Sequence, residues 1–296
     1  MTTIVTPQNV ASVAAKLVGA DLGLARLFSR DFEADFGHGS GSVVKVRVPG
    51  AVEAHTRDAR DKTTPLTQSA IIEQSIPVEL NTLAYSSVPL AAGHYDLDLT
   101  SYSAQVLAPQ AAAIAKYVER ETVDALQATP ETTSIAYSAA NPAKTFTAIR
   151  SKLRENGVGA EEPLYAAVGS AVYSDLLDGP VGSSGVTFDA DGKVRGFIVQ
   201  ASTRLAPDEI VAFIRPAFAL VVRAPVKPEG APWGATVRED EFALTALRVF
   251  DAGTATDRSI VEALVAVKAM PLAVDQEDGT VDLVADGGAV RVLTGS

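Results

Sequence analysis

The chain has 296 residues, 47% of them hydrophobic and 21% charged, and its formal net charge is −11. This composition suits a globular protein with one large or two moderate cores and excludes wholesale disorder. Cysteine is absent, which excludes disulfides, thiolate metal sites and cysteine nucleophiles.

The sequence shows neither the basic balance nor the basic patch that is typical of proteins that bind nucleic acid tightly. It has no apolar run near the about 20 residues that a membrane helix needs. Its first residues lack the basic-then-apolar pattern of a secretory signal. We therefore expect a soluble protein that is made in the cytosol and does not contact a membrane.

Residues 1–36 are predicted to contain a helix. Apolar residues from Val10 to Leu17 fall at helical spacing, and Thr6-Pro7 has the pattern of an N-cap followed by proline at the first helical position. The pattern fits a surface helix and an extended arm that docks on a neighbour about equally well.

A long excursion is predicted after the Gly/Ser-rich hinge at residues 37–42. Apolar Val44 and Val46 alternate with charged Lys45 and Arg47, which is typical of a strand. The chain returns through apolar positions, so residues 42–90 are predicted to form a two-stranded β-excursion. Its polar tip carries Arg57, Asp58, Arg60, Asp61 and Lys62. Because an isolated hairpin is marginal in water, support must come from elsewhere in the chain or from a partner subunit.

A long helix is predicted from about residue 100 to residue 128, a stretch without glycine. The apolar stripe comprises Leu107, Ala111, Ile114, Val118 and Ala125, and the charged residues Lys116, Glu119, Arg120 and Glu121 lie largely off it. Asp98 or Thr100 would cap its start, and it would span ~40 Å. Pro109 is expected to kink this helix or to mark a late start.

The rest of the chain alternates helix and strand signals. Asn141-Pro142 and Gly157 bound a predicted helix as its N-cap and C-cap. Further elements are expected as a strand at 164–168, a helix at 171–177, a glycine-rich loop at 179–185, strands at 194–200 and 209–214, a short helix or strand at 216–222, and strands at 242–250 and 260–268. Residues 271–296 form an acidic, strand-capable tail.

The sequence contains no complete catalytic, cofactor-binding or metal-binding motif. Gly157-Val158-Gly159 does not continue as a dinucleotide-binding loop, and His38, His55 and His94 lack metal-ligand spacing. Nothing in the pattern indicates a nucleophile with its base. We expect no catalytic residue, no cofactor and no metal, and therefore not an enzyme.

The stretch from Gly192 to Leu205 has glycine, strand, Gly196, apolar strand, Ser202 and leucine in turn. With residues 210–223 after it, this stretch is similar to the axial-domain pattern of Hong Kong 97-type major capsid proteins of tailed bacteriophages. The order of elements also resembles that α+β fold. The resemblance implies an N-terminal arm at 1–36, an extended loop at 37–93, a peripheral domain with spine helix at 94–130 and 241–270, an axial domain at 131–240, and a C-terminal tail at 271–296.

The resemblance implies a major capsid protein that self-assembles into hexamers and pentamers of an icosahedral head. That head encloses double-stranded DNA without sequence-specific binding, and the expected location is the virion, after assembly in the host cytoplasm. Lys45, Arg47, Arg57, Asp58, Arg60, Asp61 and Lys62 would then make contacts between subunits. A scaffolding protein, a portal and a decoration protein are the expected partners besides the chain itself. Two alternatives stay open, an encapsulin-like nanocompartment shell and, in a different class, a soluble α/β enzyme or binding protein.

Overall fold

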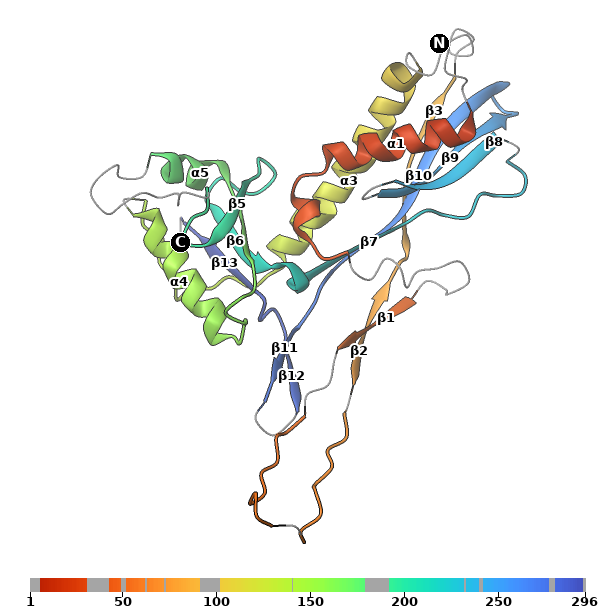
Figure 1. Cartoon of the computed structure of the whole chain (residues 1–296). Coiled ribbons are helices and arrows are strands. Elements are labelled where there is room, and N and C mark those ends of the chain that lie inside the picture. Colours follow the sequence, from red (N-terminus) through yellow and green to blue (C-terminus); the bar gives the residue numbers. More distant parts are fainter. Residues whose placement is uncertain are drawn as a thin grey trace. The chain divides into compact units, whose positions relative to one another are not determined.

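The computed structural model describes residues 6–30, 43–48, 52–61, 63–71, 73–90, 102–139, 141–178, 192–231, 233–239, 242–276 and 280–294. The chain forms two compact units (Figure 1). Unit 1 comprises residues 1–42, 79–126 and 219–268, and unit 2 comprises residues 43–78, 127–218 and 269–296. Both units contain helices and sheets, so the expected α+β class is confirmed.

Unit 1 is built on one sheet. Its strand order is β3 (Thr82–Pro89), β10 (Thr256–Ala269), β9 (Phe242–Asp251) and β8 (Trp233–Glu239), all antiparallel neighbours, and β7 (Phe218–Arg223) also pairs with β10. Burial along β10 alternates, with Val261, Ala263 and Val265 on the inner face. The strands expected at 242–250 and 260–268 are confirmed and pair with each other.

Helix α1 (Pro7–Asp21) packs against β8 and β9 of its own unit (Figure 1). The Thr6 side chain accepts the Asn9 N–H at 3.3 Å, which is the predicted N-cap. Glu239 of β8 accepts the Ser12 hydroxyl at 2.6 Å and adds a polar tie to the apolar contact. Residues 7–21 are therefore a surface helix of the chain itself, while residues 31–36 of the expected arm lie outside the described residues.

Helix α3 (Ala108–Gln127) has Pro109 as its second residue, but the backbone is already helical at Tyr102, so this proline lies within a longer helix and does not mark a late start. A π-helical turn, η4 (Ser103–Leu107), precedes it, because proline has no N–H to continue the α-helical ladder. Asp98 and Thr100, the expected caps, lie outside the described residues. The predicted apolar stripe is buried from Leu107 to Val118.

The sequence interpretation of Glu119 on α3 was wrong, because this side chain is buried instead of lying off the stripe. Its carboxylate accepts the N–H groups of Gly23, Leu24 and Ala25 at 2.6, 3.2 and 3.1 Å. These donors open the 3-10 helix η1 (Leu24–Leu27), whose first N–H groups have no partner within the helix. Glu119 thereby fixes the segment after α1 to α3.

Unit 2 holds a four-stranded sheet in the order β13 (Ala289–Leu293), β6 (Glu209–Ile214), β4 (Leu164–Val168) and β5 (Phe197–Ala201). Strands β4 and β5 are parallel, and the other pairs are antiparallel. Helices α4 (Pro142–Glu155) and α5 (Ser170–Leu177) belong to the same unit, and the short 3-10 helix η5 (Arg215–Ala217) follows β6. Phe146 of α4 meets Phe197 of β5 edge-on with ring centroids 5.6 Å apart, which joins helix and sheet through the core.

The C-terminal region, expected as a strand-capable tail, does contain strands, and they belong to unit 2. Strands β11 (Leu272–Asp275) and β12 (Val281–Val284) form a hairpin, and β13 pairs along β6. Strand β8 belongs to unit 1, although residues 219–240 were expected to group with 131–218. The partners β13 and β6 lie far apart in sequence, where local patterns carry no information, whereas β8 pairs with β9, the next strand along the chain.

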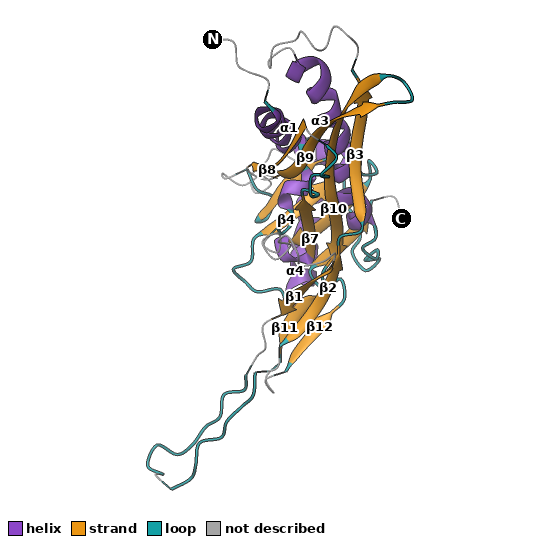
Figure 2. Cartoon of the chain, turned by 90° about the vertical axis from the view of Figure 1, so that its right-hand side faces the viewer, coloured by secondary structure: helices purple, strands orange, loops and turns teal. Residues whose placement is uncertain are grey.

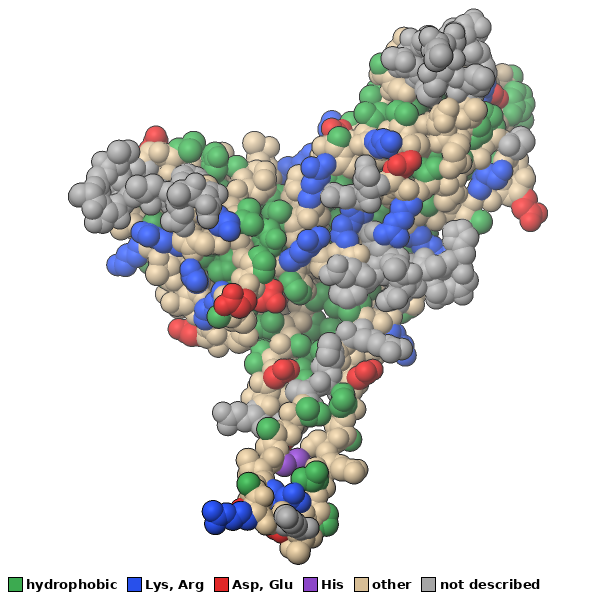
Figure 3. Space-filling view, viewed as in Figure 1, with side chains coloured by type: hydrophobic (Ala, Val, Ile, Leu, Met, Phe, Trp, Pro, Cys, Tyr) green, Lys and Arg blue, Asp and Glu red, His purple; other side chains and the backbone are tan. Residues whose placement is uncertain are grey.

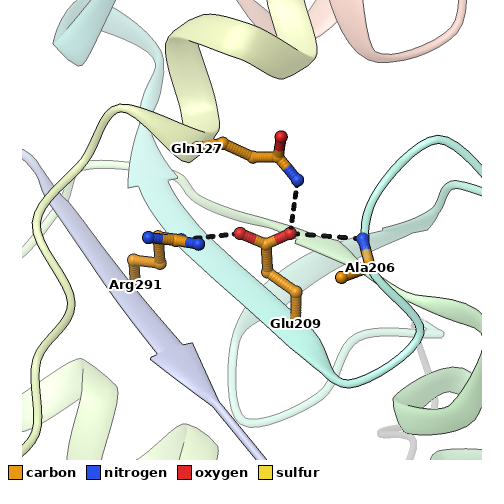
Figure 4. A network of polar contacts seen from close by, with 4 residues as sticks. All are labelled: Gln127, Ala206, Glu209 and Arg291. Atoms are coloured by element: carbon orange, nitrogen blue, oxygen red, sulfur yellow. Dashed lines mark hydrogen bonds and ion pairs between the residues drawn. The ribbon is translucent and has the colours of Figure 1, made fainter.

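A buried ionic network fixes β13 to β6 (Figure 4). The Glu209 carboxylate is fully buried and accepts Arg291 Nε at 2.6 Å. It also accepts Gln127 Nε2 at 2.8 Å and the Ala206 N–H at 3.2 Å. One carboxylate therefore holds the end of α3, the loop before β6 and the last strand together.

Candidate interaction surface

The excursion begins on a short two-stranded ribbon in unit 2. Strands β1 (Val43–Val48) and β2 (Gln74–Glu79) pair with each other. Apolar side chains of the ribbon are buried, among them Val46, Val48 and Val78. The Gln74 Nε2 donates to the carbonyl of Val281 at 2.8 Å and fixes the ribbon to β12. The base of the excursion is thus supported by its own unit.

Beyond the ribbon, residues 52–71 form two extended arms without helix or strand at the positions that the structure describes (Figure 2). The expected two-stranded excursion over 42–90 was therefore wrong for this segment, and at its far end β3 pairs with β10 instead. Described side chains of 52–71 are exposed except for the half-buried Asp61. Val52, Leu66 and Ile71 are 55%, 73% and 66% exposed, so apolar surface stands in water.

The tip of the excursion is ordered by Asp61. Its carboxylate accepts the Thr63 N–H at 2.8 Å, the Thr64 N–H at 3.2 Å and both threonine hydroxyls. These hydrogen bonds, led by that from the Thr64 hydroxyl, hold the pKa of Asp61 well below its ordinary value. Arg57 Nη1 donates to the Thr64 carbonyl at 2.7 Å and joins the two arms. The tip is thereby preformed.

Charged residues expected to contact other subunits lie in this region. Arg57, Asp58, Arg60 and Asp61 gather at the tip, and Lys45 is exposed on β1. The side chain of Arg47 and all of Lys62 lie outside the described residues. Within the described ranges, no ion pair uses any of the five placed side chains, although Asp61 and Arg57 are engaged in the hydrogen bonds of the tip.

A second surface, not found from the sequence, lies on unit 1. We call it the open sheet face; it comprises Leu83 and Tyr85 of β3 and Ile260, Glu262 and Leu264 of β10. Leu83 lies opposite Leu264, and Tyr85 lies opposite Glu262. Leu83 and Tyr85 are 43% and 67% exposed, and partial burial among apolar neighbours raises the pKa of Glu262. The period-two pattern of β10 was visible in the sequence, but its register with β3 was not.

The described residues contain no group of three or more His, Cys, Asp or Glu side chains placed to hold a metal ion. In the same part of the chain, no helix has both the length and the apolar character needed to cross a membrane.

No protein-family model and no curated protein sequence matches the chain. Solved structures do match. One from Mycobacterium phage Che8 is 17% identical, with a TM-score of 0.55, covering 92% of this chain and 91% of that one. The capsid structure of cyanophage P-SCSP1u is 14% identical, with a TM-score of 0.50 and coverages of 86% and 84%. A virus-like particle from Pyrococcus furiosus is 12% identical, with a TM-score of 0.50 and coverages of 96% and 98%.

At these identities the likeness concerns the fold alone. The chain has the fold of tailed-phage capsid proteins, and the resemblance drawn from the sequence is confirmed at that level.

Proposed function

We propose that the chain is a major capsid protein of a tailed bacteriophage, whose copies form the hexamers and pentamers of an icosahedral head around double-stranded DNA. The fold likeness along most of the chain supports this function. In the proposal unit 1 is the peripheral domain with α3 as its spine helix. Unit 2 is the axial domain, and residues 43–78 are the extended loop.

The observation that carries the proposal is the exposure of residues 52–71. Ordering a backbone costs about 1–2 kcal/mol per residue, which burial of side chains normally offsets. The described side chains of this segment bury almost nothing on their own chain, while Leu66 and Ile71 are 73% and 66% exposed. A preformed tip on unsupported arms is the expected arrangement of a segment whose supporting surface belongs to another copy.

The open sheet face is our candidate for that supporting surface. Its Leu83 and Tyr85 would cover exposed apolar side chains of a neighbour's arms. Glu262 would accept a guanidinium from the neighbouring tip, where Arg57 and Arg60 have no ion-pair partner among the described residues. Each exposed pair is worth only ~0–1 kcal/mol, but a shell repeats it in every copy.

The seven charged residues predicted as contacts, Lys45, Arg47, Arg57, Asp58, Arg60, Asp61 and Lys62, belong to this proposed interface. We test it by sedimentation and electron microscopy of the purified full chain, which should give particles of megadalton mass. Leu66→Asp should give folded subunits without particles, because it places a charge in the apolar contact. Leu177→Asp is the matched control, since Leu177 on α5 is 61% exposed and has no role in the interface.

Normal particles from Leu66→Asp would contradict the role of the excursion. A sharp monomer peak from the wild-type chain would contradict the capsid function and favour the soluble enzyme or binding protein.

A nanocompartment shell is the second candidate, favoured by the near full-length likeness to the virus-like particle from Pyrococcus furiosus. The particle contents distinguish the two functions. Nuclease-protected double-stranded DNA in native particles supports the phage head, and a protein cargo supports the nanocompartment.

Scaffolding, portal and decoration proteins are proposed as further partners, with the virion as the location. Production of well-formed shells from this chain alone would argue against the need for a separate scaffold.

A further inference from the structure

Helix α4 carries a basic face that the net charge of the chain conceals. We define the basic face as Lys144, Arg150 and Arg154 of α4 together with Lys193 and Arg195 before β5. The two segments meet, since Arg150 Nη1 donates to the Arg195 carbonyl at 3.2 Å. Figure 3 shows several Lys and Arg side chains gathered on the lobe that contains α4.

Stabilisation of the helix does not account for this face. Lys152 and Arg154 lie in the last turn, where cations suit the helix dipole, and Lys152 pairs with Glu155 at 3.7 Å. Arg154 is also held by the carbonyls of Val158 and Ala160 at 3.1 and 2.8 Å. None of this applies to the charges of Arg150 and Arg195. Over the described ranges, neither of these guanidinium groups pairs with a carboxylate.

The complementary surface is the β11–β12 hairpin of the same unit. Between Lys268 and Arg291 the sequence has five acidic residues and no basic one. Asp275 and Asp282 are exposed, and in the part of the chain that is described they form no ion pair. We call the paired strands β11 and β12 the acidic hairpin; its described carboxylates are those of Asp275 and Asp282.

The acidic hairpin is fixed at its base to the C-terminal end of α4. Asn156 Nδ2 donates to the Gly287 carbonyl at 3.1 Å, and Gly157, with φ +101°, allows Val274 to approach closely. A Cβ at Gly157 would lie 2.8 Å from a Val274 methyl. Among the described residues, each copy thus presents Arg150 and Arg195 on one surface and Asp275 and Asp282 on another, all without an ion pair to their own chain.

We propose that the basic face of one copy binds the acidic hairpin of a neighbouring copy. The inference rests on the proposed function, because closed assemblies of identical subunits need complementary, non-identical surfaces on each subunit. Charge complementarity of this kind steers association and fixes register. A nucleic-acid phosphate backbone could also bind the cations of α4. Because every copy carries one basic face and one acidic hairpin, we favour another copy of the chain as the partner of the basic face.

A charge swap tests the contact on the full chain. Arg150→Glu with Arg195→Glu reverses the basic face, and Asp275→Lys with Asp282→Lys reverses the hairpin; all four side chains are exposed. Each reversed variant should need about a hundredfold higher subunit concentration to assemble, because attraction becomes repulsion at two pairs per contact. The fourfold variant should assemble like wild type. An equimolar mixture of the two reversed variants should associate through the restored contact at concentrations at which neither variant does so alone.

Circular dichroism melting controls for folding of each variant. Normal assembly of either reversed variant, or failure of both the fourfold variant and the mixture, overturns the proposed contact. Reversed basic-face particles that form normally but lose nuclease-protected DNA would assign α4 to nucleic acid instead. A wild-type chain that stays monomeric would refute both this contact and the capsid function, whereas particles from all variants would refute this contact alone.

Discussion

Replacing Arg291 by methionine tests how far the last strand depends on one buried charge. The Arg291 side chain is 22% exposed and the Glu209 side chain 0%, so the change leaves an ionised carboxylate buried with only neutral donors, from Gln127 and Ala206. Breaking a buried pair in this way costs about 3–5 kcal/mol. Glu209→Gln should lower the stability by less, about 1–2 kcal/mol, because the Arg291 side chain that it leaves without a carboxylate keeps access to water.

Hydrogen exchange of the β6 and β13 amides measures this effect locally, which matters because the chain has two units and a single unfolding transition is not assured. A loss of 3 kcal/mol speeds exchange through local opening by about a hundredfold. The double variant should lose clearly less free energy of local opening than the two single variants lose together, since both substitutions remove the same ion pair. The importance of the buried pair is refuted if the β6 and β13 amides of Arg291→Met exchange within about tenfold of the wild-type rate. It is also refuted if Glu209→Gln speeds their exchange more than Arg291→Met does.

Three further predictions concern other parts of the chain. Glu262→Gln should raise the melting temperature of subunits at pH 7 but not near pH 3, and should weaken assembly. The raised pKa means that the charged form disfavours folding above the ordinary carboxyl pKa. Gly169→Ala should prevent folding of unit 2, because the added Cβ would lie 1.9 Å from the Ala206 carbonyl oxygen. Gly19→Ala is the control: no atom lies within 4 Å of its added Cβ, so it should stabilise α1 by about 0.5–1 kcal/mol in thermal melts. The Asp61 turn should persist as pH falls to about 4 and open only below it, read from the Thr63 amide by NMR, since a depressed pKa confers stability that is lost as pH falls through the folded value.

Helix ends were predictable because their signals act within one turn. Asn141 caps α4 by accepting the Lys144 N–H at 3.3 Å, and Gly157 takes the positive φ that ends it, as the sequence indicated. Pro109 was likewise expected to disturb its helix, and the π-helical turn η4 lies directly before it. These residues act on their own neighbourhood, so no knowledge of the fold was needed.

Strand partners were not predictable in the same way. Residues 82–89 have a strand pattern that suits the return arm of an excursion as well as an edge strand beside β10. The choice depends on which apolar faces meet, and those faces come from segments more than a hundred residues apart. The burial of Glu119 was not predicted for a related reason, since its three N–H donors belong to a segment near Gly23, far from it in sequence.

The same distinction between local and distant residues applies to the candidate interaction surfaces. The charged tip lies in one short segment, so its residues could be named from the sequence. The open sheet face and the basic face each join two distant segments, β3 with β10 and α4 with the turn before β5, and neither was found.

The charges of the chain fall into two groups that separate folding from assembly. Glu119 and Glu209 are buried, and each carboxylate is satisfied by several donors from its own unit. Arg60, Arg150 and Asp275 are exposed and, across the described ranges, form no ion pair with their own chain. Buried carboxylates that lose a donor leave a costly desolvated charge, so the first group must be complete before the unit is stable. The second group costs nothing in the free subunit, because water solvates it, and in the proposed assembly it gains partners when copies meet. Under that proposal, the buried carboxylates serve folding and the exposed charges of both signs serve contacts between copies.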